Sequence, residues 1–243
     1  MCFSYFGSKS RIAKYYPKPK YPLIIEPFAG AAWYSIHHVQ RDNLVRAWLN
    51  DKYDVIYRIW KWLIEKATPE EILSVPILKE GFDIRNLLYS IPFEFRDLLG
   101  YCYNQGVAYL PNKVTSYGLN KYEWTKEKDI GRQVRNRLRF ISKLVTLIYN
   151  WHSTNSNYTE LTNTKATWFI DPPYQNGGEQ YIHANSQINY KHLAEWCKSR
   201  KGQVIVCENE KADWLPFEVF INQKNQKKSK RIAESIFYIP ENK

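Results

Sequence analysis

The chain has 243 residues, of which 44% are hydrophobic and 24% are charged; this is enough for one compact domain with a buried core and argues against wholesale disorder. It contains no apolar run of about eighteen residues and does not begin with a basic head followed by an apolar stretch, so we expect neither a membrane-spanning helix nor a secretory signal. Lysine and arginine outnumber aspartate and glutamate by 35 to 24, for a formal net charge of +11; a field of that sign attracts polyanions such as nucleic acids, without establishing that the chain binds one.

The four cysteines are Cys2, Cys102, Cys197 and Cys207. They show no C-x-x-C spacing and no accompanying histidine cluster, which argues against a zinc site and against a disulfide framework. We therefore expect reduced thiols, no metal and a cytoplasmic location.

The first predicted elements form one α/β unit. Residues 21–26 are an apolar run typical of a buried strand, and a turn of small residues follows at 27–32. A second short strand is expected at 44–49, and residues 54–66 carry apolar side chains at helical spacing. A strand, a tight glycine turn, a helix and a strand that ends in an acidic residue are typical of a doubly wound α/β sheet with a cofactor site.

The middle of the chain, residues 67–164, interrupts this alternation and predicts an inserted, mostly helical lobe. A loop rich in Tyr, Gly and Asn is expected at 101–124, and an amphipathic helix at 129–149. The apolar stripe of that helix leaves a second face to Arg132, Arg135 and Arg139.

The α/β pattern resumes after residue 164, so residues 1–66 and 165–243 are the predicted core. The expected elements are strands at 167–170 and 203–207, a helix at 190–199, and strands at 217–221 and 234–239. The last two are joined by a turn rich in Lys, Gln and Asn, which predicts an antiparallel hairpin that completes a mostly parallel sheet.

The turn after the first strand and the end of the second strand are candidate cofactor contacts. Small residues around Glu26, Phe28, Ala29 and Gly30 leave backbone N–H groups open to a cofactor, although an ordinary strand-to-helix turn has the same composition. Asp51 ends the second strand, where a carboxylate can accept hydrogen bonds from both hydroxyls of a ribose. The alternative role for Asp51 is to cap the following helix.

Asp171, Pro172, Pro173 and Tyr174 directly follow the strand at 167–170. Two prolines enforce a stiff, extended segment, so the Asp171 carboxylate is held at the carboxyl edge of the sheet, where open α/β sheets bind ligands. A string of this kind arises by chance in a chain of this length at a rate on the order of 10⁻³, so it is a specific signal. A purely structural loop is the alternative.

The segment from Tyr5 to Lys9 has little meaning alone. It is superficially similar to a phosphate-binding loop, but the Gly-Lys-Ser/Thr order, the upstream glycine and a preceding strand are missing, which argues against an ATPase.

Together, these motifs resemble those of the Dam-like DNA N6-adenine methyltransferases of the alpha type. In that family an aromatic-x-Gly-x-Lys segment is similar to Tyr5–Lys9, and a Glu-Pro-Phe-x-Gly turn is similar to Glu26–Gly30. An acidic residue after the second strand matches Asp51, and the Asp-Pro-Pro-Tyr motif is intact at 171–174. Ala32 stands where the family pattern usually carries a second glycine.

The resemblance implies a methyltransferase-type sheet, S-adenosyl-L-methionine as cofactor and an adenine flipped out of the duplex. Asp171 and the carbonyl of Pro172 would accept hydrogen bonds from the N6 amine, and Tyr174 would stack on the ring. Whether Asp171 removes the proton or only orients the amine stays open. The implied cofactor-binding residues are Tyr5, Lys9, Glu26, Phe28, Ala29, Gly30, Asp51 and Asp171.

The resemblance also implies that residues 67–164 recognise double-stranded DNA. Within them, segments 102–106 and 116–121 are similar to the base-contacting hairpin region of the family. The expected base-reading residues are Tyr117, Asn120 and Lys121, and the expected phosphate-binding residues are Arg132, Arg135 and Arg139. A solvated basic face without a partner is the alternative. We expect a monomer, with a dimer and a cognate restriction enzyme both compatible with the sequence.

Other functions remain open. Methylation of cytosine N4 uses the same arm, but that class more often has Ser at the position of Asp171; RNA adenine is a further substrate. A catalytically silent nucleic-acid-binding protein of the same fold would show a damaged arm or lack Lys9 or Asp51, and the sequence shows neither defect.

Overall fold

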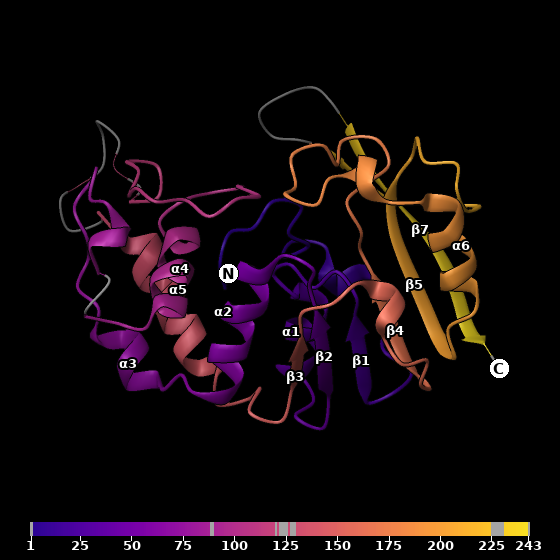
Figure 1. Cartoon of the computed structure of the whole chain (residues 1–243), viewed down its shortest axis with the longest axis horizontal. Coiled ribbons are helices and arrows are strands. Elements are labelled where there is room, and N and C mark those ends of the chain that lie inside the picture. The colour runs from indigo at the N-terminus through magenta and orange to yellow at the C-terminus, as the bar shows by residue number, and fades with distance from the viewer. Residues whose placement is uncertain are drawn as a thin grey trace.

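The computed structural model describes residues 2–87, 90–119, 121, 126, 130–224 and 231–242. A seven-stranded sheet crosses the molecule in the order β3-β2-β1-β4-β5-β7-β6 (Figure 1). Its strands are β1 (Leu23–Glu26), β2 (Arg46–Asn50), β3 (His152–Thr154), β4 (Ala166–Ile170), β5 (Gly202–Asn209), β6 (Glu218–Lys224) and β7 (Arg231–Asn242). The strands from β3 to β5 are parallel, and β7 is antiparallel to β5 and β6. The predicted α/β class, the mostly parallel sheet and the C-terminal hairpin are confirmed.

Six α-helices lie in the described part of the chain. They are α1 (Trp33–Val39), α2 (Asp54–Glu65), α3 (Pro69–Ser74), α4 (Phe93–Cys102), α5 (Arg132–Leu144) and α6 (Tyr190–Lys198). Among these described helices, none has the length and apolar character needed to cross a membrane.

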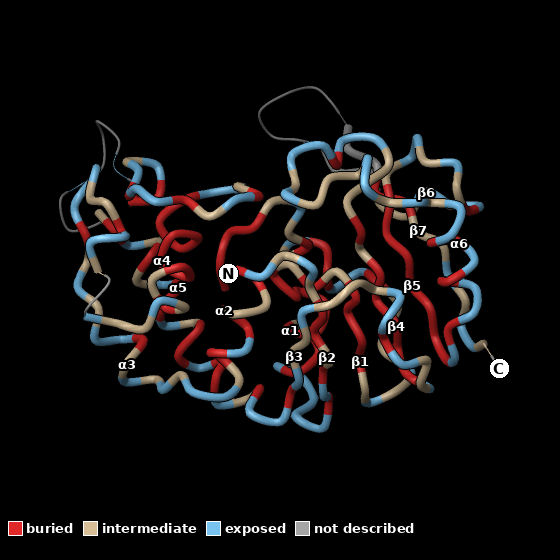
Figure 2. Tube along the Cα trace, viewed as in Figure 1, coloured by how far each residue is buried: buried red, intermediate tan, exposed pale blue. Residues whose placement is uncertain are grey.

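Successive residues of a strand point to opposite faces of the sheet, and both faces are covered. Ile24 and Phe169 belong to one buried cluster, which also contains the apolar residues of α1, α2, α4 and α5. Ile25 and Trp168 belong to a second cluster on the other face, with α6. Figure 2 accordingly shows the central strands buried along their length. Two covered faces explain why the central strands are continuous apolar runs rather than alternating ones.

The inserted region extends the molecule beyond α2, at the end of the sheet opposite to α6 (Figure 1). There α3 packs on α5, and α4 packs on α2. The helix predicted at 129–149 is shorter, since α5 begins after Gly131, whose φ is +73°, and ends at Leu144. The loop predicted at 101–124 also begins late: α4 runs to Cys102, whose burial in the core holds it in the helix.

Sequence analysis missed β3, which lies inside the range 67–164 assigned to the lobe. Residues 152–154 pair with β2, starting from His152 opposite Trp48, so this part of the range belongs to the sheet. The strand has three residues, none of them apolar, at the edge of the sheet. Such a strand has no hydrophobic periodicity by which it can be recognised.

Candidate cofactor and substrate site

A cavity of about 960 Å³, part of it open to solvent, lies beyond the carboxyl ends of β1, β2 and β4. The neighbours β1 and β4 form the topological switch point of the sheet, where open α/β sheets leave a crevice for ligands. All eight residues expected to bind the cofactor line this cavity: Tyr5, Lys9, Glu26, Phe28, Ala29, Gly30, Asp51 and Asp171.

The turn after β1 requires unusual backbone conformations. Gly30 has a φ of +46°, and a Cβ there would lie 3.1 Å from the ring of Tyr5, so the position suits glycine. Ala32 is also left-handed, with a φ of +47°. This conformation costs a residue with a Cβ roughly 1–2 kcal/mol. Glycine at this position would avoid the strain, because it has no Cβ.

Asp51 joins the turns that follow β1 and β2. Its Oδ2 accepts a hydrogen bond from the Gly30 N–H at 2.9 Å, and its Oδ1 accepts one from the Tyr53 N–H at 2.9 Å. Burial raises the pKa of Asp51 to about 6, although both hydrogen bonds favour the ionised form. The N-cap of α2 is Tyr53 rather than Asp51, but the hydrogen bond from the Tyr53 N–H means that Asp51 also supports the start of this helix. Asp51 thus presents a half-buried carboxylate to the cavity.

Glu26 is a second carboxylate in the cavity wall, and only 2% of it is exposed. Its Oε1 accepts hydrogen bonds from the backbone N–H of Ser35 at 2.9 Å and from the Ser35 hydroxyl at 2.5 Å. Burial nevertheless raises the pKa of Glu26 to about 8. No lysine or arginine in the described residues forms an ion pair with Glu26 or Asp51.

The N-terminal segment lies against Tyr181, which also lines the cavity. The Tyr181 hydroxyl donates to the Phe6 carbonyl at 3.3 Å, and the rings of Tyr5 and Tyr181 lie 6.0 Å apart. Gly7 has a φ of +72°, and a Cβ at this position would collide with the Tyr181 hydroxyl. Glycine here therefore allows the segment to approach the site and to bring Lys9 into it.

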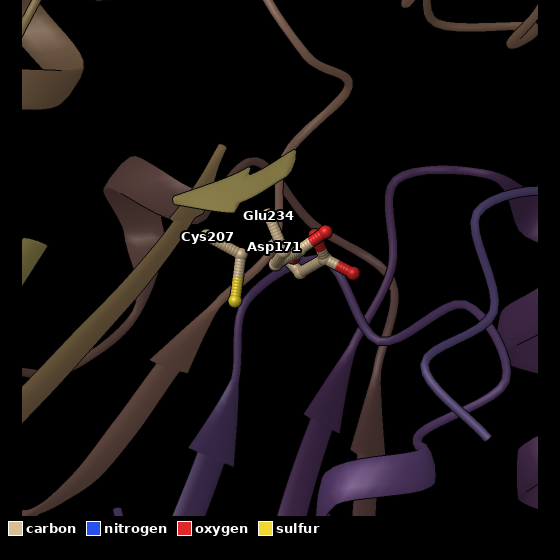
Figure 3. A group of neighbouring side chains, drawn as sticks. All are labelled: Asp171, Cys207 and Glu234. Carbon is tan, nitrogen blue, oxygen red and sulfur yellow. The ribbon is translucent and has the colours of Figure 1, made fainter. Parts of the chain in front are cut away.

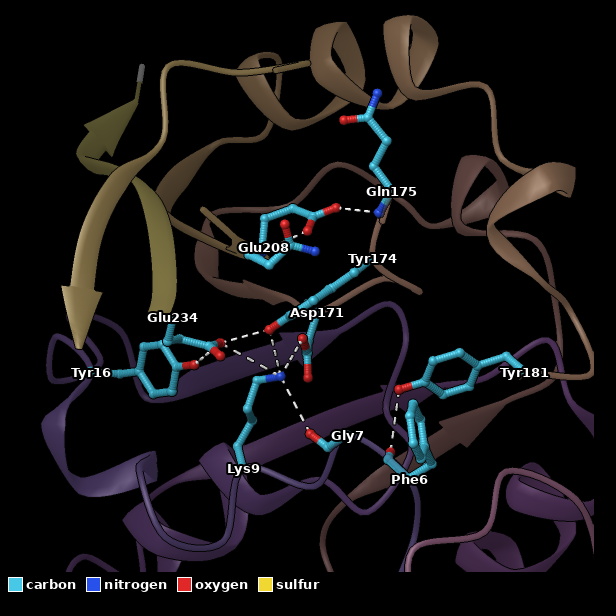
Figure 4. Close-up of polar contacts among 11 residues, drawn as sticks. Phe6, Gly7, Lys9, Tyr16, Asp171, Tyr174, Gln175, Tyr181, Glu208 and Glu234 are labelled. Atoms are coloured by element: carbon cyan, nitrogen blue, oxygen red, sulfur yellow. Dashed lines mark hydrogen bonds and ion pairs between the residues drawn. The ribbon is translucent and has the colours of Figure 1, made fainter. Parts of the chain in front are cut away.

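The Asp-Pro-Pro-Tyr segment, which we call the arm (residues 171–174), is fixed by hydrogen bonds. The Tyr190 hydroxyl donates to the Pro173 carbonyl at 2.6 Å. The N–H of Gln175, next to the arm, donates to the buried carboxylate of Glu208 at 2.5 Å (Figure 4). Within the described residues, no hydrogen bond reaches the Pro172 carbonyl. Pro172 is buried and, unlike Asp171 and Pro173, does not line the cavity.

Asp171 follows β4 directly and lines the cavity, and 21% of its side chain is exposed. The Lys9 ammonium lies 2.8 Å from its Oδ1. Burial raises the pKa of Asp171 to about 6, and this effect exceeds the opposing effect of Lys9. Asp171 is thus a carboxylate that is ionised at neutral pH and can accept hydrogen bonds from a ligand.

Lys9 and Tyr174 are bound to each other as well as to the arm. The Lys9 ammonium donates to the Tyr174 hydroxyl at 2.8 Å and to the Gly7 carbonyl at 3.3 Å (Figure 4). The Tyr174 hydroxyl in turn donates to Glu234 Oε1 at 2.7 Å. Tyr174 is absent from the cavity wall, and Lys9 lies over its ring at 4.7 Å from the centroid. Lys9 therefore contacts the arm as well as lining the predicted cofactor cavity.

Asp171, Cys207 and Glu234 form the cluster that most resembles a metal site among the described residues (Figure 3). Their potential ligand atoms lie within 4.8 Å of one another. The ammonium of Lys9 already supplies a cation to this cluster, at 2.8 Å from Asp171 and 3.5 Å from Glu234. Burial raises the pKa of the Cys207 thiol, so it is protonated rather than a thiolate ligand. We therefore assign no metal to the cluster.

Several cavity residues were not predicted from the sequence. Ser156, Asn157 and Tyr158 follow the missed strand β3, and Tyr158 packs against Phe28 with ring centroids 5.5 Å apart. Glu234 lies on β7, more than two hundred positions from Lys9. Only the paired strands bring residues 156–158 to the cavity and Glu234 to Lys9, and no local motif marks them.

The predicted phosphate-binding arginines lie on α5. Arg132 and Arg139 are exposed and Arg135 is half-buried, whereas Val134 and Leu138 on the other face are buried in the core. The guanidinium of Arg139 lies 3.5 Å from the Asn136 side chain. The structure therefore places the basic face and the apolar face as the helical spacing predicts.

The predicted base-reading residues differ in exposure. Tyr117 is 43% exposed, and the exposed Lys121 forms an ion pair with Glu80 at 3.1 Å. Asn120 lies outside the described residues. Segment 102–106, which resembles a base-contacting region, is largely internal: the Tyr103 hydroxyl accepts a hydrogen bond from Leu78 N–H and is buried.

Asn104 is also buried, and its side-chain amide donates to the carbonyls of Gly100 and Lys113. These bonds join the end of α4 to the following loop. Tyr103 and Asn104 thus stabilise the lobe internally, because their polar groups are already used within the protein.

Comparison with known proteins identifies no relative. Neither a protein-family model nor a curated protein matches the chain.

Proposed function

We propose that the chain is an S-adenosyl-L-methionine-dependent methyltransferase that acts on the N6 amine of adenine in double-stranded DNA. The observation that carries this proposal is the intact arm, with Asp171 in the wall of a cavity that also holds two carboxylates without a cationic partner. The fold supports it, because a doubly wound sheet with a C-terminal antiparallel hairpin is the architecture that the family resemblance implies.

The charge of the cavity favours a cationic ligand. Asp51, whose pKa is about 6, is ionised at neutral pH and has no ion-pair partner in the described residues, and Lys9 is engaged by Asp171 and Glu234. Glu26, whose pKa is about 8, adds a further negative charge only above that pH. A nucleotide bound through phosphates would meet repulsion here, whereas the sulfonium and ammonium of S-adenosyl-L-methionine would be attracted. The cofactor residues fit this ligand: Asp51 for the ribose hydroxyls and the turn at Gly30 for close backbone approach.

The cofactor, when bound, supplies an electrophilic methyl group. The residues of the arm orient the nucleophile: Asp171 and the Pro172 carbonyl accept hydrogen bonds from the two N–H groups of the amine, which directs its lone pair toward the methyl group. Since the pKa of Asp171 is about 6, it is a weak base at neutral pH. We infer that it orients the amine during transfer, and that positioning supplies most of the acceleration.

The target amine must leave the base stack to reach a site at the carboxyl edge of the sheet. The exposed Arg132 and Arg139 on α5 suit phosphate contacts, and Tyr117 and Lys121 suit base contacts. We propose that residues 67–149 bind the duplex, because this part of the chain contributes all of these side chains and lies at one end of the sheet.

The main alternative is a silent nucleic-acid-binding protein of the same fold. The integrity of the arm argues against it: burying Asp171, Lys9 and Glu234 together is costly unless the arrangement has a use. Methylation of cytosine N4 or of RNA adenine would use the same arm, so these are outcomes of the test rather than separate proposals.

The test is incubation of the protein with tritium-labelled S-adenosyl-L-methionine and duplex DNA or RNA, followed by nucleoside mass spectrometry. We expect label in N6-methyladenine from DNA. Asp171→Asn should abolish transfer, and Asp42→Asn, at an exposed aspartate, should not. N4-methylcytosine or labelled RNA alone would correct the substrate. No transfer by the folded wild type, with no cofactor binding by calorimetry, would reject the enzyme class.

A further inference from the structure

Glu234 is a buried carboxylate on β7 that belongs to no sequence motif. It is 8% exposed, and its Oε1 accepts hydrogen bonds from the hydroxyls of Tyr16 at 2.6 Å and Tyr174 at 2.7 Å. The same oxygen lies 3.5 Å from the Lys9 ammonium. Of these three contacts, Lys9 also contacts Asp171, and Tyr174 belongs to the arm (Figure 4).

The Lys9 ammonium is shared between two carboxylates. It lies 2.8 Å from Asp171 and 3.5 Å from Glu234, and only 7% of Lys9 is exposed. Burial alone would lower the pKa of Lys9, but Asp171 and Glu234 together raise it, so the ammonium is charged. Since one cation faces two anions, the charge that Lys9 offers to Asp171 depends on Glu234.

We propose that Glu234 is a positioning residue of the site, which sets how strongly Lys9 neutralises Asp171 and fixes the hydroxyl of Tyr174. This rests on the proposed function, in which Asp171 must be a good acceptor for an amine. With Glu234 present, part of the positive charge of Lys9 is offset by Glu234, so Lys9 offsets less of the negative charge of Asp171. Without the charge of Glu234, Lys9 neutralises Asp171 more completely, and the arm becomes a poorer acceptor.

A purely structural role for Glu234 would predict a different pattern. A residue that only stabilises the hairpin would affect unfolding but would leave the titration of Asp171 unchanged. The hydrogen bonds of Glu234 run to the N-terminal segment and to the arm rather than along β7. They connect the last strand of the chain to residues that the sequence motifs place in the site.

Other titratable groups face Asp171 and must be held constant in any test. Nearest are Lys9, Tyr174 and Glu234. Around them are Glu26 on β1, Cys207 and Glu208 on β5, Tyr16 after the N-terminal turn, and Tyr181. Burial raises the pKa values of these five groups, so Tyr16, Tyr181 and Cys207 stay neutral near pH 6. Glu234, with a carboxyl oxygen within 4.8 Å of one of Asp171, is therefore the neighbouring carboxyl group that glutamine can replace with an isosteric amide.

The experiment compares wild type with Glu234→Gln and Glu234→Ala. Glutamine keeps an acceptor for both tyrosine hydroxyls and removes only the charge. Glu241→Gln is the matched control, since Glu241 lies on the same strand and its side chain is 46% exposed. Two readouts are taken: the pH dependence of kcat for methyl transfer, and the titration of the Asp171 carboxyl carbon by ¹³C NMR, assigned with Asp171→Asn.

We expect Glu234→Gln to lower the pKa of Asp171, since Glu234 raises it. The two carboxylates lie within 4.8 Å. A shift of roughly one to two pH units is expected for charges this close in a buried site. The acid limb of kcat should move down by the same amount, with a lower plateau and an unchanged affinity for the cofactor. Glu234→Ala should shift the titration in the same direction, and Glu241→Gln should not shift it.

The outcomes separate this inference from the proposed function. Unshifted Asp171 titration in folded Glu234→Gln or Glu234→Ala would overturn the role of Glu234 and leave the enzyme class intact. If the wild type transfers no methyl group, the proposed function fails, while the NMR titration still decides whether Glu234 sets the charge of Asp171. If glutamine prevents folding, the alanine variant supplies the same comparison.

Discussion

Replacement of Glu26 by glutamine is expected to stabilise the empty protein and, above pH 8, to weaken binding of a cationic ligand. Glu26 has an ordinary pKa of 4.5 and, because it is buried, a pKa of about 8 in the folded chain. Below pH 4.5 it is protonated in both states. Between pH 4.5 and 8 the folded chain retains a proton that the unfolded chain has released, so the free energy of unfolding falls as the pH rises.

The magnitude follows from this difference. At about 1.36 kcal/mol per pKa unit, Glu26 destabilises the fold by about 3 kcal/mol at pH 7 and by less than about 1 kcal/mol at pH 5. Glutamine has no such titration, and its carbonyl can still accept both hydrogen bonds from Ser35. The gain in stability from Glu26→Gln should therefore increase with pH.

The assay is urea unfolding of wild type and Glu26→Gln at pH 5, 6, 7 and 8 without ligand and at constant ionic strength. Glu210→Gln, at an exposed glutamate, is the control and should show no such trend. A stability difference that is the same at every pH would refute the reasoning. Calorimetry above pH 8, where Glu26 of the wild type is ionised, should show weaker binding of S-adenosyl-L-methionine to Glu26→Gln, because only there does the variant lack a negative charge that the wild type has.

Three further changes test separate contacts. Asp51→Ala should weaken cofactor binding about 10- to 100-fold, the loss of one charge-assisted hydrogen bond or slightly more; unchanged affinity in a folded variant by calorimetry would contradict it. Joint replacement of Arg135 and Arg139 by glutamine should reduce the salt dependence of DNA binding by about 0.9 per lost phosphate contact, and equal slopes in a titration from low to high salt would argue for a merely solvated face. Tyr190→Phe removes the hydrogen bond to Pro173. We expect the free energy of unfolding to fall by about 1 kcal/mol and kcat to fall, with unchanged cofactor affinity. An unaltered kcat would show that the arm does not depend on this contact.

The parts of the fold that the sequence predicts are those with a strong local signal. The strand before Asp171 is a run of buried residues, and α2 begins and ends within one residue of the predicted range 54–66. Small residues at the turn after β1 and the acidic residue after β2 mark the cavity, because a backbone-lined turn can be built from few residue types. These features depend on neighbouring residues and can be recognised without knowing the fold.

The contacts that the sequence did not reveal are long-range. Glu234 reaches Lys9 only because β7 lies next to β5, and Tyr158 reaches Phe28 only because β3 extends the sheet. The location of Tyr103 is a further case: polar and aromatic residues in a loop suggest base contacts, yet this hydroxyl accepts a hydrogen bond from Leu78 inside the lobe. Composition alone does not distinguish a side chain that meets a ligand from one that satisfies the backbone.

The basic charge of the chain and the acidic character of its cavity are consistent with two ligands of opposite charge. The formal net charge is +11, yet Glu26 and Asp51 in the cavity have no cationic partner in the described residues. Surface charges act over about 8–10 Å at physiological salt, so they attract a polyanion as a whole, whereas buried carboxylates act on what enters the cavity. On the proposed function, a DNA phosphate would be attracted to the surface and repelled by the ionised Asp51 in the cavity, whereas a cationic cofactor would be attracted into the cavity. This separation would keep the DNA backbone out of the cavity while admitting a neutral base next to Asp171, which lines the cavity.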